Sequence, residues 1–138
     1  MRIEAWLRRL LYATLAVLFA SGVAWWMFGE GDAARPYLIA AHGLAAMIAL
    51  LALGATAVLH VRESWKRRRN RWSGLVVATA LGVLVITAFG LYYIGSDRLR
   101  SYTSLVHLVV GVAMPLLILA HVVLGARSRP RLDDEDFL

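Results

Sequence analysis

The residues of this chain best suited to chemistry are its four histidines, His42, His60, His107 and His121, and each lies in a long apolar stretch. His107 and His121 are fourteen positions apart, which is about 1400° of helical rotation, so they share nearly one face of a helix. His42 and His60 are eighteen positions apart, about five full turns, so they share a face as well. At about 1.5 Å of rise per residue, the two intervals correspond to roughly 21 Å and 27 Å. Each stretch therefore presents two imidazoles on one side at two depths, and this predicts two separate ligand sites.

A single histidine in an apolar helix is also explained by packing or hydrogen bonding, since a polar group in a membrane is costly and needs a partner. Packing alone is a poor explanation for four imidazoles matched in depth and face on two helices. We therefore predict one ligand pair of His42 with His107 and a second of His60 with His121. The pattern is weakest at His60, because Arg62 follows it closely at the end of the stretch.

The number of ligands narrows the choice of metal centre. Zinc takes four ligands, or three and a water, and two-histidine copper would lack supporting methionine or cysteine ligands at each level. Haem iron already has four porphyrin nitrogens and needs two axial ligands, and the macrocycle is itself apolar. The chain has no cysteine, which excludes disulfides, iron–sulfur ligation and covalent haem attachment within it. Two non-covalent b-type haems fit this pattern best.

The stretches that carry the histidines have the composition of membrane helices. Hydrophobic residues make up 60% of the 138 positions, against about 45–50% in soluble domains, and the mean hydropathy is +0.65. The sequence predicts an all-α, integral membrane, up-and-down four-helix bundle in one domain, residues 1–138. Its predicted helices are about 10–28, 37–61, 72–94 and 102–126, with an acidic tail at 132–138. The basic start and first apolar run also resemble a signal peptide, but Trp25 and Trp26 favour a retained helix with an interfacial belt.

The net charge of +6 reflects membrane topology and does not indicate nucleic-acid binding, because most Lys and Arg residues border the apolar stretches. Twelve of them fall on the face that carries both termini, and three, Arg35, Arg98 and Arg100, fall on the other. The positive-inside rule then predicts cytoplasmic termini in a multi-pass protein of the bacterial inner membrane. Helices 37–61 and 102–126 would run in the same direction, as diagonal neighbours. His42 and His107 would share the outer level, and His60 and His121 the inner level.

Haem also needs space, and small residues on the predicted helix faces would supply it. The positions concerned are Ser21-Gly22, Ala46, Ala49, Gly82, Gly90, Gly111 and Gly125. Any membrane helix interface uses small residues in the same way, so they favour haem only weakly. Pro115, between the two histidines of its helix, predicts a kink. Such bending, or relative tilt, would absorb the different axial spacing of the two histidine pairs.

With these residues in view, the chain resembles the four-helix di-haem b-type cytochromes of bacterial membranes. These include the cytochrome b subunits of nickel–iron hydrogenases and formate dehydrogenases, and the N-terminal bundle of quinol-oxidising cytochromes b. The resemblance covers all four helices. The interval from His107 to His121 matches the family spacing, whereas the longer interval from His42 to His60 departs from it. The resemblance carries over these four positions as axial ligands.

The resemblance implies transmembrane electron transfer between a partner redox protein, or a larger respiratory complex, and the quinone pool. Candidate cations for the haem propionates are Arg35, Arg98 and Arg100 outside and Arg62, Arg71 and Arg127 inside, although each also sets orientation. Candidate quinone-site residues are Tyr92, Tyr93 and Asp97, although interfacial tyrosines are ordinary. No catalytic residue is predicted, because bis-histidine iron has no open position for a substrate.

Two other classes of function fit the same sequence. One is a haem-free membrane anchor or assembly subunit, in which the histidines bond across the bundle. The other is a membrane haem sensor or haem-handling protein. A visible spectrum of the purified chain separates the first from an electron carrier, and reduction by a quinol analogue separates the second.

Overall fold

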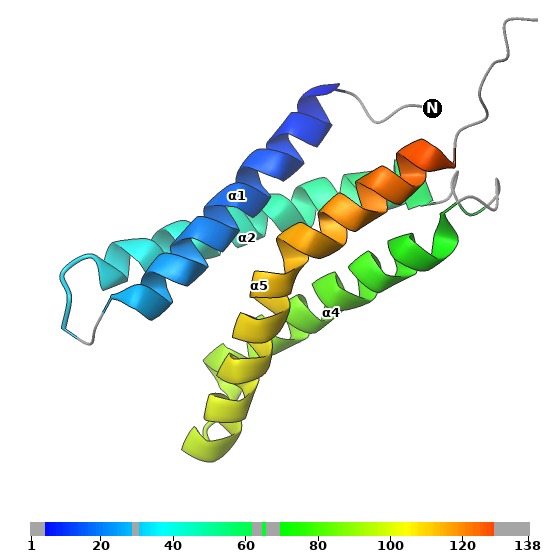
Figure 1. Cartoon of the computed structure of the whole chain (residues 1–138). Helices are drawn as coiled ribbons and strands as arrows, with labels where there is room; N and C mark the ends of the chain where they lie inside the picture. The colour runs from blue at the N-terminus through cyan, green and yellow to red at the C-terminus, as the bar shows by residue number, and fades with distance from the viewer. Residues whose placement is uncertain (1–4, 29–30, 62–64, 66–69, 129–138) are drawn as a thin grey trace, which may run out of the picture.

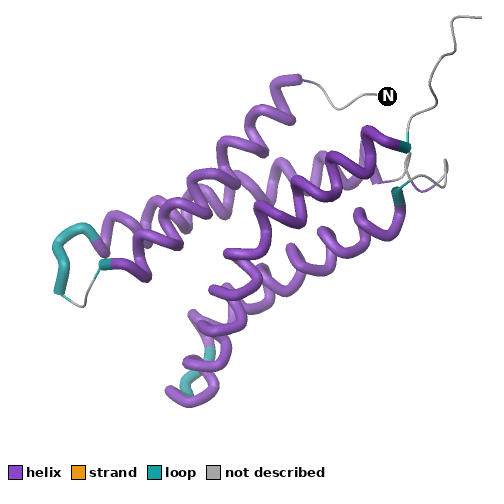
Figure 2. The backbone as a smooth tube through the Cα atoms, viewed as in Figure 1, coloured by secondary structure: helices purple, strands orange, loops and turns teal. Residues whose placement is uncertain are grey.

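The structure, a computed structural model, describes residues 5–28, 31–61, 65 and 70–128, and this part of the chain is helical apart from its turns. The four long helices are α1 (Ala5–Met27), α2 (Arg35–Thr56), α4 (Arg71–Tyr93) and α5 (Asp97–Arg127). A short π-helical segment, η1 (Ala57–Val61), continues α2 without a break (Figures 1 and 2). The prediction of an all-α chain with four long apolar helices is confirmed.

All four long helices begin earlier than the sequence predicts, α2 and α4 by one or two residues and α1 and α5 by five. α1 starts at Ala5 and α5 at Asp97, because charged residues outside the apolar stretch still extend each helix by one or more turns. Asp97 lies in the first turn of α5, where a carboxylate is favourable beside the unpaired N–H groups. Arg100 then donates from Nε and Nη2 to the Ile94 carbonyl at 3.2 and 2.8 Å. The predicted loop at 95–101 is therefore only a tight turn. The predicted acidic tail lies outside the described residues.

The helices form two antiparallel hairpins. α1 packs along α2, α4 packs along α5, and α1 also contacts α5. Figure 1 shows the beginning of α1, the end of η1, the beginning of α4 and the end of α5 at one end of the molecule. This arrangement is compatible with a four-helix bundle.

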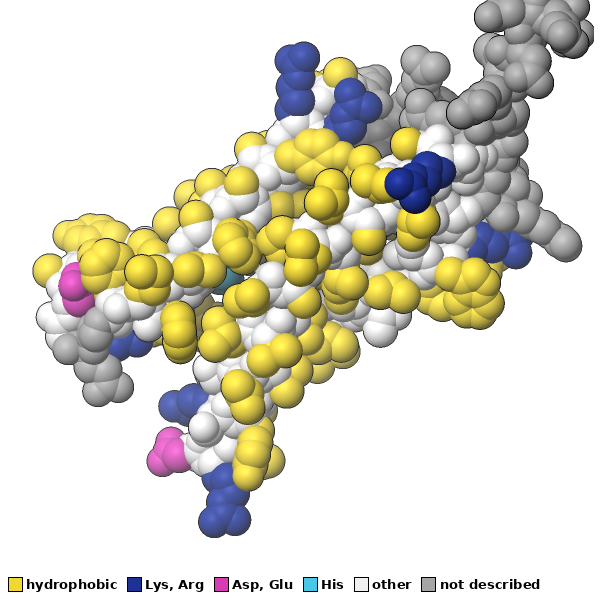
Figure 3. Space-filling view, in the orientation of Figure 1, with side chains coloured by type: hydrophobic (Ala, Val, Ile, Leu, Met, Phe, Trp, Pro, Cys, Tyr) yellow, Lys and Arg dark blue, Asp and Glu magenta, His cyan; other side chains and the backbone are white. Residues whose placement is uncertain are grey.

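The molecule buries few large side chains and exposes many apolar ones. Leu7, Leu11 and Ala52 form a small core cluster between α1 and α2, whereas Leu51 is 78% exposed and Ile86 72%. Hydrophobic side chains cover the length of the helices in Figure 3, and charged side chains gather towards the two ends. All four helices are long and apolar enough to cross a membrane. An apolar surface of this extent needs apolar surroundings.

Two irregularities affect the positions of the histidines. Pro115 lies inside α5, and Figure 1 shows α5 changing direction about midway along its length, as a proline without an N–H predicts. His60 lies in η1, where i→i+5 bonding puts more residues into each turn than an α-helix has. A π-helical turn advances less along the axis per residue, so it shortens the longer interval from His42 to His60.

Candidate metal centre formed by two histidine pairs

The structure brings the four histidines together in the two pairs that the sequence predicts. The rings of His42 (α2) and His107 (α5) have centroids 6.1 Å apart and planes at 64°. The rings of His60 (η1) and His121 (α5) have centroids 6.3 Å apart and planes at 87°. All four residues are half-buried. The histidines that the sequence placed at equal depth thus lie side by side, and the two resulting pairs follow one another along α5.

A serine on α1 determines which nitrogen of His42 carries the proton. Ser21 Oγ lies 2.9 Å from His42 Nδ1 and also bonds the carbonyl oxygen of Val17 at 2.6 Å. A carbonyl only accepts, and the Val17 carbonyl makes the shorter contact, so we assign the single hydroxyl proton to Val17 and the role of acceptor for His42 Nδ1–H to the serine oxygen. Nε2, on the other side of the ring, is left unprotonated with a free lone pair.

A threonine on α4 does the same for His107. Thr87 Oγ1 lies 2.8 Å from His107 Nδ1 and donates its proton to the Val83 carbonyl at 2.7 Å. His107 therefore donates from Nδ1 and keeps Nε2 as an acceptor. The main-chain carbonyls of Leu18 and Leu84 also lie beside the rings of His42 and His107, respectively.

At the level of His60 and His121, Ser73 takes the same role towards His121. Its Oγ lies 2.9 Å from His121 Nδ1, and Asn70 contacts both Ser73 Oγ and the His121 carbonyl oxygen. A hydrogen bond from Nδ1–H to an oxygen is the usual way in which proteins fix a metal-binding histidine for ligation through Nε2.

The spacing of each pair fits a metal held between two trans imidazoles. A metal–nitrogen bond of about 2.0–2.1 Å, with about 1.1 Å from that nitrogen to the ring centre, places two such centroids about 6.3 Å apart. The described residues hold no group of three or more His, Cys, Asp or Glu side chains that could bind a metal ion. The donor set is therefore two imidazoles per site, which suits a group that needs only two protein ligands, as haem does.

The glycines near the histidines make room mainly for the imidazole rings. A Cβ at Gly22 would lie 3.4 Å from His42 Cε1, and a Cβ at Gly74 would lie 3.4 Å from His121 Cε1. The same Ser-Gly pair, Ser21-Gly22 on α1 and Ser73-Gly74 on α4, thus supports one ligand at each level. The expectation that Ser21-Gly22 makes space for a macrocycle stays a prediction, and the structure adds this contact of Gly22 with the His42 ring. A Cβ at Gly82 would meet nothing within 4 Å.

Sequence reasoning missed three polar residues around the histidines: Thr87, Ser73 and Asn70. A signal for Thr87 was present, because it precedes His107 by twenty positions and Ser21 precedes His42 by twenty-one. Each hydroxyl residue precedes the histidine of its own helix hairpin by nearly the same number of positions. Both are therefore candidates for accepting a hydrogen bond from that histidine. No such spacing marks Ser73 or Asn70, which precede His121 by 48 and 51 positions.

The six candidate propionate arginines differ in their surroundings. The guanidinium of Arg35 lies 4.0 Å from the Trp25 ring centre, and that of Arg71 lies 5.0 Å from Trp65. In both residues Nε is buried without a hydrogen-bond partner in the described part of the chain. Arg100 instead donates a hydrogen bond to the Ile94 carbonyl in the turn between α4 and α5. Arg98 and Arg127 are exposed, and Arg62 lies outside the described residues.

The candidate quinone-site residues lie together at one end of the α4–α5 hairpin without enclosing a site. Tyr92, Tyr93 and Asp97 are exposed, and Tyr93 stacks on Phe89 with 6.3 Å between ring centroids. A separate open hollow of about 550 Å³ lies at the α1–α2 turn and is lined by Trp25, Gly31, Asp32, Ala33, Arg35, Pro36 and Ile39.

No protein family, curated protein or solved structure matches the chain. The functional argument therefore depends on the chain's own residues.

Proposed function

We propose that this chain is a transmembrane electron carrier that binds two haem b groups without covalent attachment. His42 and His107 would hold one iron, and His60 and His121 the other. The observation that carries the proposal is the pair of neighbouring imidazoles at each level, with ring centroids 6.1 Å and 6.3 Å apart. Both spacings suit a metal between two ring nitrogens.

The proton positions favour this reading over a haem-free anchor. In an anchor the histidines would bond across the bundle, and the Nδ1 bonds of His42 to Ser21 and of His107 to Thr87 meet that expectation. The two readings differ at the other ring nitrogen. Each histidine then keeps an acceptor nitrogen that has no donor within the described part of the chain. Two lone pairs without a donor are costly in an apolar setting, and a bound cation would compensate both.

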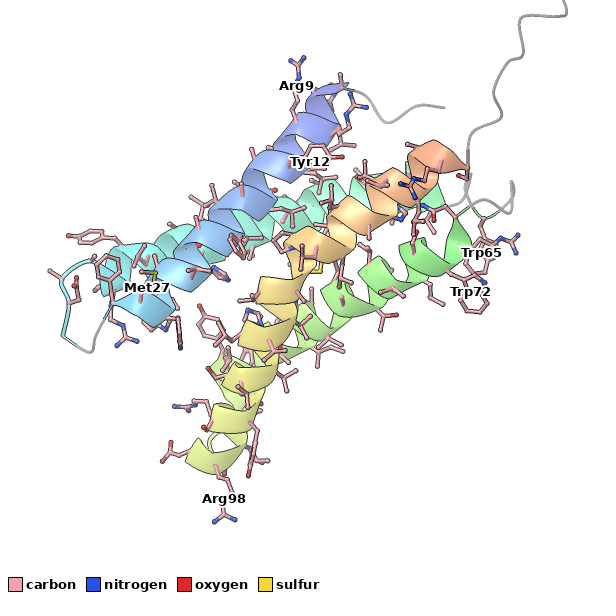
Figure 4. All side chains as sticks on the ribbon, viewed as in Figure 1. Arg9, Tyr12, Met27, Trp65, Trp72 and Arg98 are labelled. Carbon is pink, nitrogen blue, oxygen red and sulfur yellow. The ribbon has the colours of Figure 1, made fainter. Side chains whose placement is uncertain are left out.

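The membrane setting is the second part of the proposal. Four apolar helices, with charged groups at both ends of the molecule (Figure 3), support a multi-pass protein. Arg9 and Trp72 lie towards one end and Arg98 at the other (Figure 4). The excess of Lys and Arg on the side of Arg9 makes that side cytoplasmic. We place the protein in the bacterial inner membrane, with both termini inside, lipid around the apolar faces and the His42–His107 level outermost.

The chain's own residues hold and orient two redox centres. The two histidines of each pair would hold one haem, and bound haem would supply one-electron transfer. Ser21, Thr87 and Ser73 keep three ligands in the tautomer that binds through Nε2, and Gly22 and Gly74 let neighbouring helices approach the rings. Arg35 and Arg71, with buried unpartnered Nε atoms, are the arginines best prepared to take a carboxylate at the two levels.

The partners follow from the function. A redox partner protein or a larger respiratory complex would supply or accept electrons at the surface. The quinone pool is the membrane-soluble alternative. Nothing in the described residues assigns a quinone site.

Haem content tests the proposal. The chain, expressed with haem available and purified in mild detergent, should contain two low-spin haems, both extracted by acid acetone because no thioether bond holds them. Incorporation of no haem would contradict the proposal and favour the haem-free anchor. Haems that a quinol analogue cannot reduce, alone or with a redox partner, would favour a haem sensor instead.

A further inference from the structure

Asn70 is where the inner histidine site differs most from the outer one. It immediately precedes α4 in a left-handed backbone conformation, with φ 49° and ψ 35°. It is the single non-glycine residue with positive φ in the described part of the chain. Asparagine at this position usually caps its own helix, but here its side chain makes no capping bond. Its Nδ2 instead lies 2.9 Å from the main-chain oxygen of His121 on α5.

The hydrogen bonds around Asn70 follow from one another. The His121 carbonyl can only accept, so the amide nitrogen of Asn70 must face it, and Oδ1 faces Ser73. Oδ1 can also only accept, so the Ser73 hydroxyl gives it the proton. Ser73 Oγ then has only lone pairs to offer His121 Nδ1, 2.9 Å away. Asn70 Nδ2 also lies 3.4 Å from His121 Nδ1, but its shorter bond, 2.9 Å, is to the His121 carbonyl oxygen. The shorter contacts therefore assign the proton of His121 to Nδ1.

Gly125 makes room for this arrangement. It lies one helical turn beyond His121, and a Cβ there would be 3.1 Å from Asn70 Nδ2, closer than side chains normally approach. The outer site has no counterpart to Asn70. Ser21 and Thr87 donate their protons to carbonyls of their own helices, so no third residue determines their polarity.

We propose that Asn70 is a positioning residue for the inner site. Through Ser73 it holds His121 as the Nδ1–H tautomer, and through the His121 carbonyl it holds α5 against the start of α4. Nε2 of His121 is thereby kept free as a ligand. The inference rests on the proposed function only for the identity of the group that Nε2 binds, because the tautomer is a property of the haem-free chain.

The first experiment measures the tautomer directly. Histidine ¹⁵N NMR of the haem-free chain in detergent, assigned with His→Ala variants, should show His121 as Nδ1–H. Asn70→Gly removes the side chain and keeps a left-handed backbone at no steric cost. It should give His121 a mixture of both tautomers and leave His42 and His107 unchanged. An unchanged His121 in Asn70→Gly would overturn the inference.

A second pair of variants tests the link through Ser73 should Asn70→Gly fail to fold. Ser73→Ala keeps the bond between Asn70 and the His121 carbonyl but removes the acceptor for Nδ1, so it should give the same mixture of tautomers. Ser73→Thr keeps a hydroxyl and should behave like the unchanged chain. A pure Nδ1–H tautomer in Ser73→Ala would also overturn the inference.

The haem-loaded chain supplies the third readout. Asn70→Gly should shift the midpoint potential and electron paramagnetic resonance signal of the inner haem, and loosen its binding about tenfold to a hundredfold. The outer haem should be unaffected. Two haems with an unchanged inner signal in this variant would refute only the inference. If the unchanged chain bound no haem but the variants showed the expected tautomers, only the proposed function would be refuted.

Discussion

At the scale of single residues, the account depends on where each imidazole proton lies. Ser21 is buried and gives its own proton to Val17 at 2.6 Å, so it serves His42 only as an acceptor. Hydroxyls that bond the main chain of their own helix are common in apolar helices. What distinguishes Ser21 and Thr87 is the second contact, across a helix pair, to a histidine.

Loss of that acceptor should weaken only the outer site. Ser21→Ala should reduce retention of the outer haem about tenfold to a hundredfold, as losses of hydrogen-bond partners of metal ligands do. Haem release from each site, followed by visible absorbance with apomyoglobin as acceptor, measures this.

Thr14→Ala is the matched control. Thr14 is also a buried hydroxyl on α1, bonded to the Leu10 and Leu11 carbonyls at 3.0 Å, and its loss should leave both sites intact. Equal effects of the two variants would remove the special role of Ser21.

Arg35 provides an electrostatic prediction at the same scale. Arg35→Gln removes a positive charge near the outer level, so oxidised haem is stabilised relative to reduced haem and the potential falls. At about 10 Å and an effective dielectric constant of about 20 the interaction is about 1.7 kcal/mol, or about 70 mV for one electron. A redox titration measures the fall. Arg100→Gln removes the same charge from a side chain that is bonded to the Ile94 carbonyl in the turn, so it should shift the outer potential less. A potential unchanged in Arg35→Gln would remove Arg35 from the outer site.

At the scale of helices, close approach of neighbouring elements fixes the ring positions. Gly22 on α1 lies against His42 on α2, so the pairing of these helices positions the ring as well as the hydrogen bond. The same contact recurs between Gly74 on α4 and His121 on α5.

A bulky side chain at Gly22 should therefore disrupt one site selectively. Gly22→Leu should displace the His42 ring and abolish the outer haem, because Cβ alone already reaches 3.4 Å from that ring. Gly54→Leu on α2 is the control, since a Cβ there meets nothing within 4 Å. Haem quantification and circular dichroism separate loss of a site from loss of the fold. Retention of both haems in Gly22→Leu would contradict the packing.

The sequence predicted the helices and the ligand pairs better than the details that position the rings. The pairs followed from geometry, because residues at equal depth on two helices of the same direction meet. The hydroxyl partners did not follow, because a serine such as Ser73 bonds locally on any face of a helix. The π-helical turn at His60 and the early start of α5 at Asp97 depend on local hydrogen bonding, which the apolar pattern does not encode. The left-handed Asn70 had no distinguishing signal in the sequence.

At the scale of the whole molecule, two stacked sites suit transfer along the membrane normal. The histidines of α5 are fourteen residues apart, roughly 21 Å of axial rise. An electron that crosses the full membrane field exchanges about 2.3 kcal/mol per 100 mV. The apparent potential difference between the two haems should therefore vary with membrane potential in sealed vesicles.

The orientation can be tested cleanly because the chain has no cysteine. Single variants Arg9→Cys and Arg98→Cys place one thiol at each end of the molecule (Figure 4). A membrane-impermeant maleimide should label Arg98→Cys in intact spheroplasts and Arg9→Cys only in inverted vesicles. The reverse pattern would overturn the assigned topology, and labelling of both from one side would contradict a spanning bundle.

The most direct test of the central claim is a redox titration of the four single variants His42→Ala, His60→Ala, His107→Ala and His121→Ala, with haem content measured for each. The account predicts that His42→Ala and His107→Ala disturb the same haem, and that His60→Ala and His121→Ala disturb the other. Disturbance of one haem by both His42→Ala and His121→Ala, or unchanged spectra in all four variants, would contradict it.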